Sequence, residues 1–210
     1  MRLMQRGQEL VIRVDGRELM STRVHGSEDA LADLACDRLE KDNRSLTGVR
    51  ILIGGLGIGF TLAAALKRVG QGATVTVAEL VPQVVKWNRG KLGEAADHPL
   101  NDPRTVVYIG DVADVIKKPP APWDAVLLDV DNGPDGLTKS DNDWLYGYEG
   151  LSCVLSSLSP GGVMGIWSAA PDDRFTRRIQ KVGFRTTAEV RVRARGKKGG
   201  MMHHIWICTA

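Results

Sequence analysis

The sequence predicts an α/β fold built on a doubly wound, mostly parallel, seven-stranded sheet. From residue 49 onward, short apolar runs alternate with helical stretches, which is the pattern of a parallel sheet covered by helices on both faces. A glycine-rich turn follows the first of these runs. After residue 183 the alternation stops, and two strand-like runs joined by a glycine- and lysine-rich loop predict an antiparallel hairpin at the end of the sheet.

The first 48 residues follow a different pattern and are predicted to form an appendage, 1–48, to a main domain, 49–210. Two apolar runs flank Asp15-Gly16, a dipeptide that accepts the positive φ values of a tight turn, so a small β-hairpin is expected here. A helix is then expected over 27–41, with Ser27 as its N-cap and apolar residues along one face.

The main domain is predicted to contain five parallel strands, each short and apolar as doubly covered strands are. They are expected at 49–54, 75–80, 106–111, 124–130 and 162–168. Helices are expected between and after them, at 59–69, 82–96, 112–117, 143–158 and 171–182. The closing hairpin is expected to pair 186–195 with 203–209.

Length and composition favour one globular core, and the pattern of the cysteines favours a reducing compartment. The chain has 210 residues, of which 43% are hydrophobic and 25% charged. No apolar run is long enough to span a membrane, and charges interrupt the N-terminus too early for a secretory signal, so a cytoplasmic location without a membrane partner is expected. Cys36, Cys153 and Cys208 lie at no metal-ligand spacing, so they are expected to be free thiols and no metal site is predicted.

The excess positive charge lies mostly in 191–200 and does not demand a nucleic-acid partner. The net charge is only +3. Arginines at 191, 193 and 195 alternate as one exposed strand face would, and no aromatic residues stand between them for base stacking. Nucleic acid is therefore not expected as a partner, and RNA methylation is a minor alternative.

The glycine-rich turn between the first parallel strand and its helix predicts a ligand site. Such a turn brings backbone N–H groups and the positive end of a helix against a ligand. A dinucleotide fingerprint would need a small residue at position 60, where this chain has Phe60. The spacing that fits is GxGxG, at Gly55, Gly57 and Gly59 after Gly54, which is the loop that holds the amino-acid end of S-adenosylmethionine (SAM) in class I methyltransferases. Tight strand-to-helix packing is the alternative reason for these glycines.

Three acids stand at the ends of predicted strands in register with this turn. Glu79, Asp111 and Asp129 end the second, third and fourth strands, and the carboxyl ends of parallel strands meet at one cleft. Glu79 is placed to accept the ribose hydroxyls of an adenosine group, and Leu80 and Val112, which follow two of the acids, are expected to line the same cofactor site. The alternative for each acid alone is a helix N-cap or a solvated loop residue.

Four segments together resemble the spermidine synthase branch of the class I SAM-dependent transferases: 49–62, 75–90, 102–116 and 123–134. The resemblance implies a Rossmann-like sheet of the class I methyltransferase type and a homodimer. It further implies that Glu79 binds the cofactor ribose, that Asp111 contacts the adenine amino group, and that Asp129 lies where the nucleophilic amine is held and deprotonated.

Two departures from that family bear on the reaction. The family's glycine loop reads GGGDGG, and this chain has Gly57 where that acid, which belongs to the aminopropyl donor site, would stand. The family's DxxD motif is also altered, because Asn132 takes the place of the second acid and Asp131 is the residue able to replace it. The first change favours ordinary SAM over decarboxylated SAM. The second weakens the expectation of a polyamine substrate, because a diamine needs negative charge at both of its ends.

Asp129 and Asp131 are the predicted catalytic residues. An amine must attack unprotonated, and a partly desolvated carboxylate with an acidic neighbour can take its proton. For Asp131 a simple turn is the alternative. Further residues are predicted to contact the substrate, each with turn or core packing as its alternative: His25, Asn132, Tyr146 and Trp167.

The sequence thus predicts a SAM-dependent methyltransferase that acts on a small molecule, with an amine among the candidate acceptors. Aminopropyl transfer from decarboxylated SAM is the second candidate. A non-catalytic protein that binds an adenosine ligand is the third.

Overall fold

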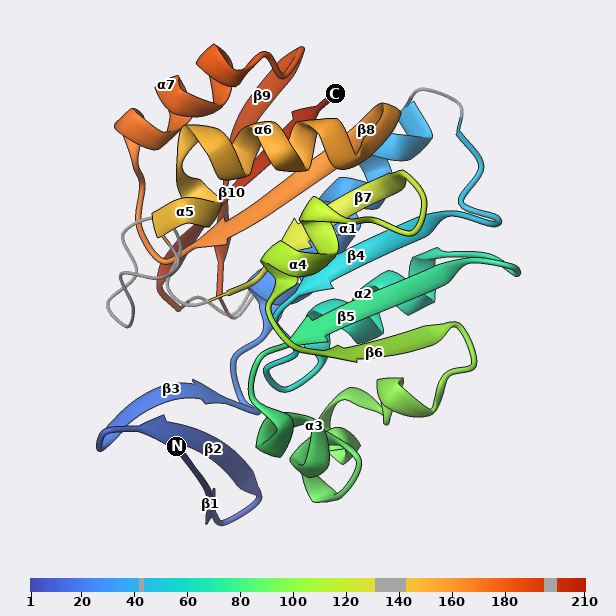
Figure 1. Ribbon diagram of the computed structural model, residues 1–210. Coiled ribbons are helices and arrows are strands. Elements are labelled where there is room, and N and C mark those ends of the chain that lie inside the picture. The colour runs from blue at the N-terminus through green and yellow to red at the C-terminus, as the bar shows by residue number, and fades with distance from the viewer. Residues whose placement is uncertain (42–43, 131–142, 195–199) are drawn as a thin grey trace.

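The predicted main sheet is present in the computed structural model, which describes residues 1–41, 44–130, 143–194 and 200–210. Within these residues the sheet has seven strands: β4 (Arg50–Gly54), β5 (Thr74–Glu79), β6 (Thr105–Ile109), β7 (Trp123–Leu128), β8 (Leu158–Ser168), β9 (Thr186–Arg193) and β10 (Met202–Thr209). Their order across the sheet is β6-β5-β4-β7-β8-β10-β9. The first five run parallel and β10 pairs antiparallel with β8 and β9, which confirms the predicted fold class (Figure 1).

The chain reverses its direction of travel across this sheet beside β4. It runs outward from β4 through β5 to β6, and then returns to β7 on the other side of β4. In an open α/β sheet, the loops after two strands that diverge in this way leave a crevice at their carboxyl ends. The topology therefore places a crevice at the ends of β4 and β7.

The central strands are apolar because both of their faces are covered. Ile51, Leu52 and Ile53 in β4 are buried, as are Val75 and Val77 in β5. Side chains alternate between the two faces of a strand, so each of these runs contributes to the cores on both sides of the sheet.

Helices cover both faces of the sheet (Figure 1). One face carries α1 (Gly26–Lys41), α2 (Phe60–Arg68) and α3 (Pro82–Asn88). The other face carries α4 (Val112–Lys117), α5 (Asp143–Tyr146), α6 (Tyr148–Ser157) and α7 (Asp173–Val182). Two 3₁₀ helices, η1 (Lys91–Ala96) and η2 (Pro99–Asn101), follow α3. In this described part of the chain, no helix is long and apolar enough to cross a membrane.

The N-terminal segment forms a three-stranded antiparallel sheet, which corrects the predicted two-stranded hairpin. Its strands are β1 (Arg2–Arg6), β2 (Glu9–Val14) and β3 (Arg17–Ser21). The predicted Asp15-Gly16 turn joins β2 to β3 and has positive φ at both residues. Strand β1 was not predicted because four of its five residues are exposed, so its sequence carries no alternation of polar and apolar residues.

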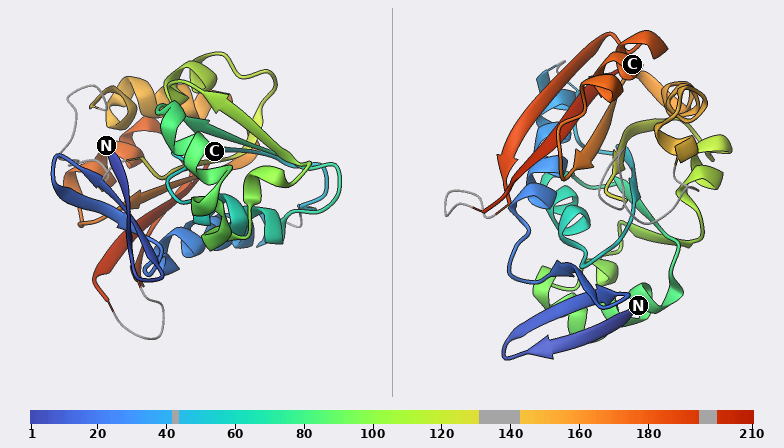
Figure 2. Two further views of the ribbon diagram at one scale, coloured as in Figure 1. Left: turned by 90° about the horizontal axis from the view of Figure 1, so that it is seen from below. Right: turned by 90° about the vertical axis from the view of Figure 1, so that its left-hand side faces the viewer.

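This N-terminal sheet packs over the glycine turn of the main domain. Leu10 and Ile12 of β2 lie in one apolar cluster with Ile58 in the turn and with Phe60 and Ala63 in α2. Figure 2 shows the small sheet as a separate layer at one end of the molecule. The appendage therefore supplies a wall above the carboxyl ends of the central strands.

Helix α1 begins one residue earlier than predicted, and Ser27 is not its N-cap. Ser27 lies inside the first turn, and its buried hydroxyl contacts a side chain of β10 instead of the helix backbone. Leu31 and Leu39 of α1 belong to the core beneath the main sheet. The domain boundary at residue 48 stays a prediction, and this packing ties α1 to the main domain.

Two further predicted helices are interrupted in the structure. The helix expected at 82–96 ends at Asn88 and continues after Gly90 as η1. The helix expected at 143–158 is divided by Gly147 into α5 and α6. Both breaks fall at glycines, which disfavour the helical conformation more than most other residues do.

Candidate active site

A cavity of about 360 Å³ lies at the carboxyl ends of the central strands, beneath the N-terminal sheet. This volume is in the range of small-molecule sites. The residues of the main domain that were predicted to bind the cofactor and that line the cavity are Gly55, Gly57, Glu79, Leu80, Asp111 and Val112. Asp129 also lines it, and Ile12, Val14, Asp15, Leu19 and Met20 line it from the N-terminal sheet. The structure therefore brings the glycine turn and all three predicted acids to one cleft.

Position 55 in the glycine turn requires a residue without a side chain. Gly55 has a φ of +88°, and its N–H donates to the carbonyl oxygen of Ala78 at 2.8 Å. A Cβ atom added at Gly55 would lie 2.4 Å from the carbonyl oxygen of Asp129. The close approach of the two strand ends thus leaves room only for glycine.

The other glycines of the turn divide between the cavity and the surrounding packing. A Cβ atom at Gly54 would lie 3.1 Å from Val112, and one at Gly59 would lie 3.1 Å from Pro99. Gly57 faces Met20 of the N-terminal sheet, whose sulfur would lie 3.0 Å from an added Cβ. Packing therefore accounts for Gly54 and Gly59, whereas Gly55 and Gly57 lie against the cavity.

Glu79 ties the glycine turn to the end of β5. Its side chain is buried, and Oε2 accepts the N–H of Leu56 at 3.0 Å while Oε1 accepts the N–H of Val81 at 2.8 Å. Each carboxylate oxygen has a further lone pair, so the same group can accept ligand hydroxyls. Its role as the ribose ligand stays a prediction.

Asp111 is the N-cap of α4, as the alternative interpretation of this acid proposed. Its Oδ1 accepts the N–H of Ala113 at 2.8 Å. The residue also lines the cavity, together with the buried Val112 that follows it. The cap fixes the carboxylate beside the cavity, and its contact with the adenine amino group stays a prediction.

Asp129 stands directly after β7, beside the glycine turn. Its N–H donates to the carbonyl oxygen of Gly54 at 2.9 Å, and its Oδ2 accepts the hydroxyl of Thr61 at 2.6 Å. Burial raises the pKa of Asp129 to about 6, although the hydrogen bond from Thr61 opposes the shift. Asp131 and Asn132, which were predicted beside it, lie outside the described residues.

Glu28, in the first turn of α1, is a second acid near Asp129 that was not predicted from the sequence. Burial raises the pKa of Glu28 to about 7, and the negative charge of Asp129 adds to the effect. Thr61 links Asp129 to Glu28, since the hydroxyl that donates to Asp129 also lies 3.4 Å from the carbonyl oxygen of Glu28. An acid at a helix start is explained by the helix dipole alone, so nothing local in the sequence indicated this role.

The predicted substrate residues lie on different sides of the sheet. On the α1 side, His25 stacks on Phe60 with ring centres 4.1 Å apart, and Trp167 meets the ring of His203 edge-on at 4.7 Å. On the other side, Tyr146 is buried and donates to the carbonyl oxygen of Val130 at 3.1 Å. The Tyr146 hydroxyl thus supports the chain just after Asp129, and substrate contact stays a prediction for all three residues.

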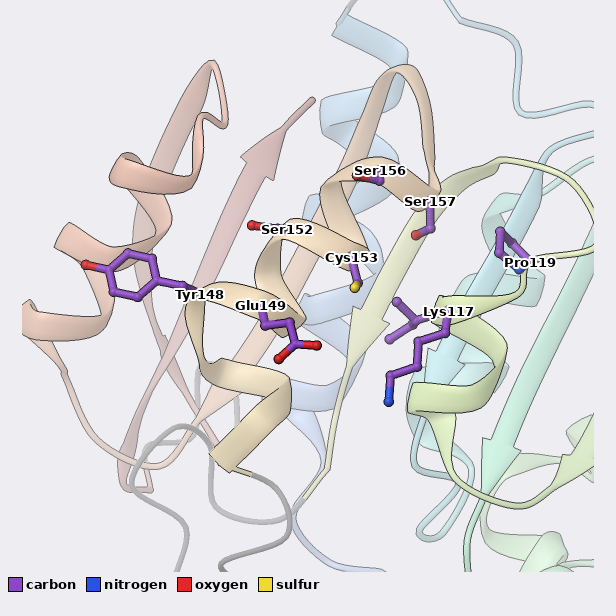
Figure 3. Close-up of a pocket in the computed structure, with 9 residues that line it drawn as sticks. Lys117, Pro119, Tyr148, Glu149, Ser152, Cys153, Ser156 and Ser157 are labelled. Atoms are coloured by element: carbon purple, nitrogen blue, oxygen red, sulfur yellow. The ribbon is translucent and has the colours of Figure 1, made fainter.

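A larger hollow of about 550 Å³ lies elsewhere, between α4 and α6. Figure 3 shows Lys117 and Pro119 on one side of it, with Glu149 and Cys153 on α6 opposite. None of the predicted site residues lines it. Since the strand-end acids and the glycine turn converge at the other cavity, the chemistry is assigned there.

Comparisons with known proteins agree with this arrangement. No family model matches the chain. The polyamine aminopropyltransferase of Sulfolobus acidocaldarius is 31% identical over 121 residues, a match that covers 58% of this chain and only 39% of that protein. A spermidine synthase from Thermotoga maritima aligns with 99% of this chain and 72% of its own, at a TM-score of 0.74 and 19% identity. An O-methyltransferase from Bacillus cereus, solved with SAH, aligns with 88% of this chain and 80% of its own, at a TM-score of 0.58 and 16% identity.

The two kinds of structure differ in how much of the chain they match. At 99% coverage the spermidine synthase alignment includes the N-terminal sheet, whereas the O-methyltransferase alignment leaves 12% of the chain unmatched. A spermidine synthase solved with the transition-state analogue AdoDATO gives the same coverage of 99%, at a TM-score of 0.72. The chain therefore has the fold of the class I SAM-dependent methyltransferases, in its spermidine synthase-like form.

Proposed function

We propose that the protein is a SAM-dependent transferase that moves a methyl group to a small, amine-bearing acceptor. One observation carries this proposal: a single cavity is lined by the glycine turn, Glu79, Asp111 and Asp129. These groups offer a backbone cradle, two acids for an adenosine group and a third acid beside them.

The residues present fit an adenosyl cofactor. Gly55 and Gly57 line the cavity, so the amino-acid end of SAM would lie along the glycine turn. Glu79 would accept the ribose hydroxyls, and Asp111 would accept the adenine amino group. Leu80 and Val112 supply apolar surface to the same cavity. When bound, SAM supplies a methyl group on a positively charged sulfur that is a good leaving group.

The chain's own contribution would be to position the acceptor and remove a proton from it. Asp129 would take one proton from the ammonium form of the acceptor, which frees the nitrogen lone pair. The nitrogen then forms a bond to the methyl carbon as the carbon–sulfur bond breaks, and the electron pair of that bond stays on sulfur. The raised pKa of Asp129 suits it to accept a proton near neutral pH.

Aminopropyl transfer from decarboxylated SAM is the second candidate function. The alignment of spermidine synthases with 99% of the chain favours it, as does the polyamine aminopropyltransferase match. The glycine turn is evidence against aminopropyl transfer, because Gly57 provides no carboxylate for the free amine of decarboxylated SAM. The Met20 side chain occupies the adjoining space.

Calorimetric titration with SAM, decarboxylated SAM and methylthioadenosine tests the proposal. We expect SAM to bind more tightly than decarboxylated SAM. The reverse order would favour aminopropyl transfer, and binding of none of the three would refute the assignment. Tight binding of SAM without turnover on broad amine and hydroxyl panels would instead support a non-catalytic adenosine-ligand protein.

Introducing an acid at position 57 should shift the donor preference. The double substitution Gly57→Asp with Met20→Ala removes the obstructing sulfur, and a φ of +51° is one that aspartate tolerates better than most residues. We expect the ratio of affinities for decarboxylated SAM over SAM to rise by about tenfold, the effect of one well-placed charge pair. Met20→Ala alone is the control and should leave the ratio unchanged. An unchanged ratio in the double variant would show that this end of the cavity does not hold the amino-acid tail.

Two substitutions at Asp111 separate its capping role from ligand binding. Asp111→Ser keeps an N-cap oxygen, whereas Asp111→Ala removes the cap and should cost about 1 kcal/mol of stability. We expect both variants to lose SAM affinity to a similar extent, because neither carries a carboxylate for the adenine amino group. Thermal unfolding measures the first effect and calorimetry the second. Full affinity in Asp111→Ser would mean that Asp111 is only a helix cap.

A further inference from the structure

Side chains from two elements, α1 and β10, meet at Glu28 on the α1 side of the sheet. The hydroxyl of Ser27 donates to Oε2 of Glu28 at 2.6 Å. The same hydroxyl oxygen lies 2.8 Å from Nδ1 of His203, a residue of β10 that is 176 positions away in the chain. Ser27 and His203 are both buried. Ser27 and His203 thus form a hydrogen-bonded chain that holds Glu28, and neither residue is among the proposed cofactor contacts.

The hydrogen count of this chain determines the tautomer of His203. A serine hydroxyl has one hydrogen, and in this arrangement it is given to Glu28. When Glu28 is ionised, Nδ1 of His203 therefore carries the hydrogen of its contact with Ser27. Burial lowers the pKa of His203, with the neighbouring His204 adding to the effect, so the ring is neutral near pH 7.

The titratable groups that face Glu28 come from each element around it. Asp129 faces it from the end of β7, and His25 from the residue before α1. His203 reaches it through Ser27 from β10. His25 also contacts Oδ2 of Asp29 at 2.7 Å. Thr61 links the two acids, since its hydroxyl donates to Oδ2 of Asp129 at 2.6 Å and lies 3.4 Å from the carbonyl oxygen of Glu28.

We propose that Glu28 is a positioning residue whose carboxylate acts together with that of Asp129 on the acceptor amine, and that Ser27 and His203 hold it in place. This inference rests on the proposed function, namely an amine acceptor beside Asp129. It assigns to α1 the second acid that the altered motif after β7 lacks at position 132. The acid comes from an element far from that motif in the sequence.

The proposed role has a simple charge balance. With both carboxylates ionised, the pair attracts an alkylammonium ion. One proton moves from that ion to Asp129, the freed nitrogen forms its bond to the methyl carbon, and the carbon–sulfur bond breaks with its electron pair left on sulfur. The product nitrogen is again a cation, and the remaining charge of Glu28 stabilises it. The proton on Asp129 then leaves to solvent, which restores the ionised pair.

The test is binding of 1,4-diaminobutane to the full chain saturated with S-adenosylhomocysteine, measured between pH 5 and 8. In the unaltered protein we expect amine affinity to rise as the carboxylate pair ionises in the upper part of this range. Glu28→Gln should weaken amine binding at pH 7.5 by about tenfold or more, as expected for loss of one partner of a buried charge pair. It should also move the midpoint of the rise to lower pH, because the remaining carboxylate has no acidic neighbour.

Ser27→Ala should move that midpoint in the opposite direction. The hydrogen bond from Ser27 lowers the pKa of Glu28, so its removal should shift the midpoint to higher pH. Glu40→Gln, at the exposed end of the same helix, is the matched control and should change neither affinity nor midpoint. A purely structural role for Glu28 would alter unfolding temperature without moving the midpoint.

The outcomes separate this inference from the proposed function. If Glu28→Gln binds the amine with the affinity and midpoint of the unaltered protein, the inference is wrong. It is equally wrong if the unaltered protein, with S-adenosylhomocysteine bound, takes up no amine. Failure to bind S-adenosylhomocysteine at all would instead refute the proposed function itself.

Discussion

Replacing Asp129 by asparagine is expected to lower kcat by about 10²- to 10⁴-fold, the range that a general base typically contributes. Asparagine keeps the size of the side chain and can still accept the hydroxyl of Thr61, so the geometry of the turn should survive. Only the capacity to take a proton from the acceptor is lost. Single-turnover measurements with SAM and an amine found in the acceptor panel would give the rate.

The controls for Asp129→Asn are cofactor binding and a distant acid. Calorimetry should show SAM affinity close to that of the unaltered protein, because the proposed partner of Asp129 is the acceptor and not the cofactor. Asp173→Asn, at the start of α7 on the other face of the sheet, should leave kcat unchanged. Unchanged turnover in Asp129→Asn would remove the proposed base.

The same substitution should make the protein more stable at pH 8 than the unaltered chain. The folded pKa of Asp129 is raised above its ordinary value near 3.8, so the folded state holds its proton more tightly than the unfolded state. The resulting stabilisation is complete below about pH 4 and is lost as pH rises through about 6. Asparagine carries no charge to bury, and thermal unfolding at pH 5 and pH 8 should show a smaller difference in the variant.

Gly55→Ala is expected to have the largest effect on the cofactor cleft. The added Cβ would meet the Asp129 carbonyl oxygen at 2.4 Å, a backbone atom that cannot move without displacing the end of β7. We expect a loss of about 3 kcal/mol or more of unfolding free energy, above the roughly 1–2 kcal/mol of a left-handed backbone alone. SAM binding should become undetectable, because the turn and Asp129 would both shift.

Gly48→Ala is a closely matched control for this prediction. Gly48 has a φ of +71°, but an added Cβ there would find no atom within 4 Å. This variant should therefore show only the cost of the left-handed backbone, about 1–2 kcal/mol, with SAM affinity retained. Equal losses of unfolding free energy at the two positions would mean that the structure relaxes around the added Cβ at position 55. The contact with Asp129 would then not be the reason for glycine there.

The strands and the cleft could be predicted because their signals are local. The apolar runs of β4, β5 and β7 follow from burial on both faces, and the acids after them follow from the rule that parallel strands end on one edge. Helix α4 was predicted at 112–117 and is observed from Val112 to Lys117, because Asp111 is a strong N-cap signal. The glycine spacing, which is also local, indicated SAM as the ligand.

Other parts of the site carried no local signal. Glu28 and Ser27 have ordinary explanations at a helix start, and only the packing of α1 against β10 brings Ser27 to His203. Thr61 is one small polar residue in a helix, and only the return of the chain to β7 places its hydroxyl on Asp129. Strand β1 has no burial pattern, because four of its five residues are exposed, and its pairing with β2 is what defines it as a strand.

By itself the sequence determined the α/β class, the order of the main elements, the glycine turn and the three acids at the strand ends, because spacing and hydrophobic periodicity act over a few residues. The tertiary structure decided which groups surround Asp129. Its hydrogen bond, its burial and its acidic neighbour come from α2, the closed core and α1, segments distant in sequence that meet only when the sheet is assembled. The charge state of a buried carboxylate depends on that complete environment, and so the protonation chemistry of this cleft became visible only in the folded chain.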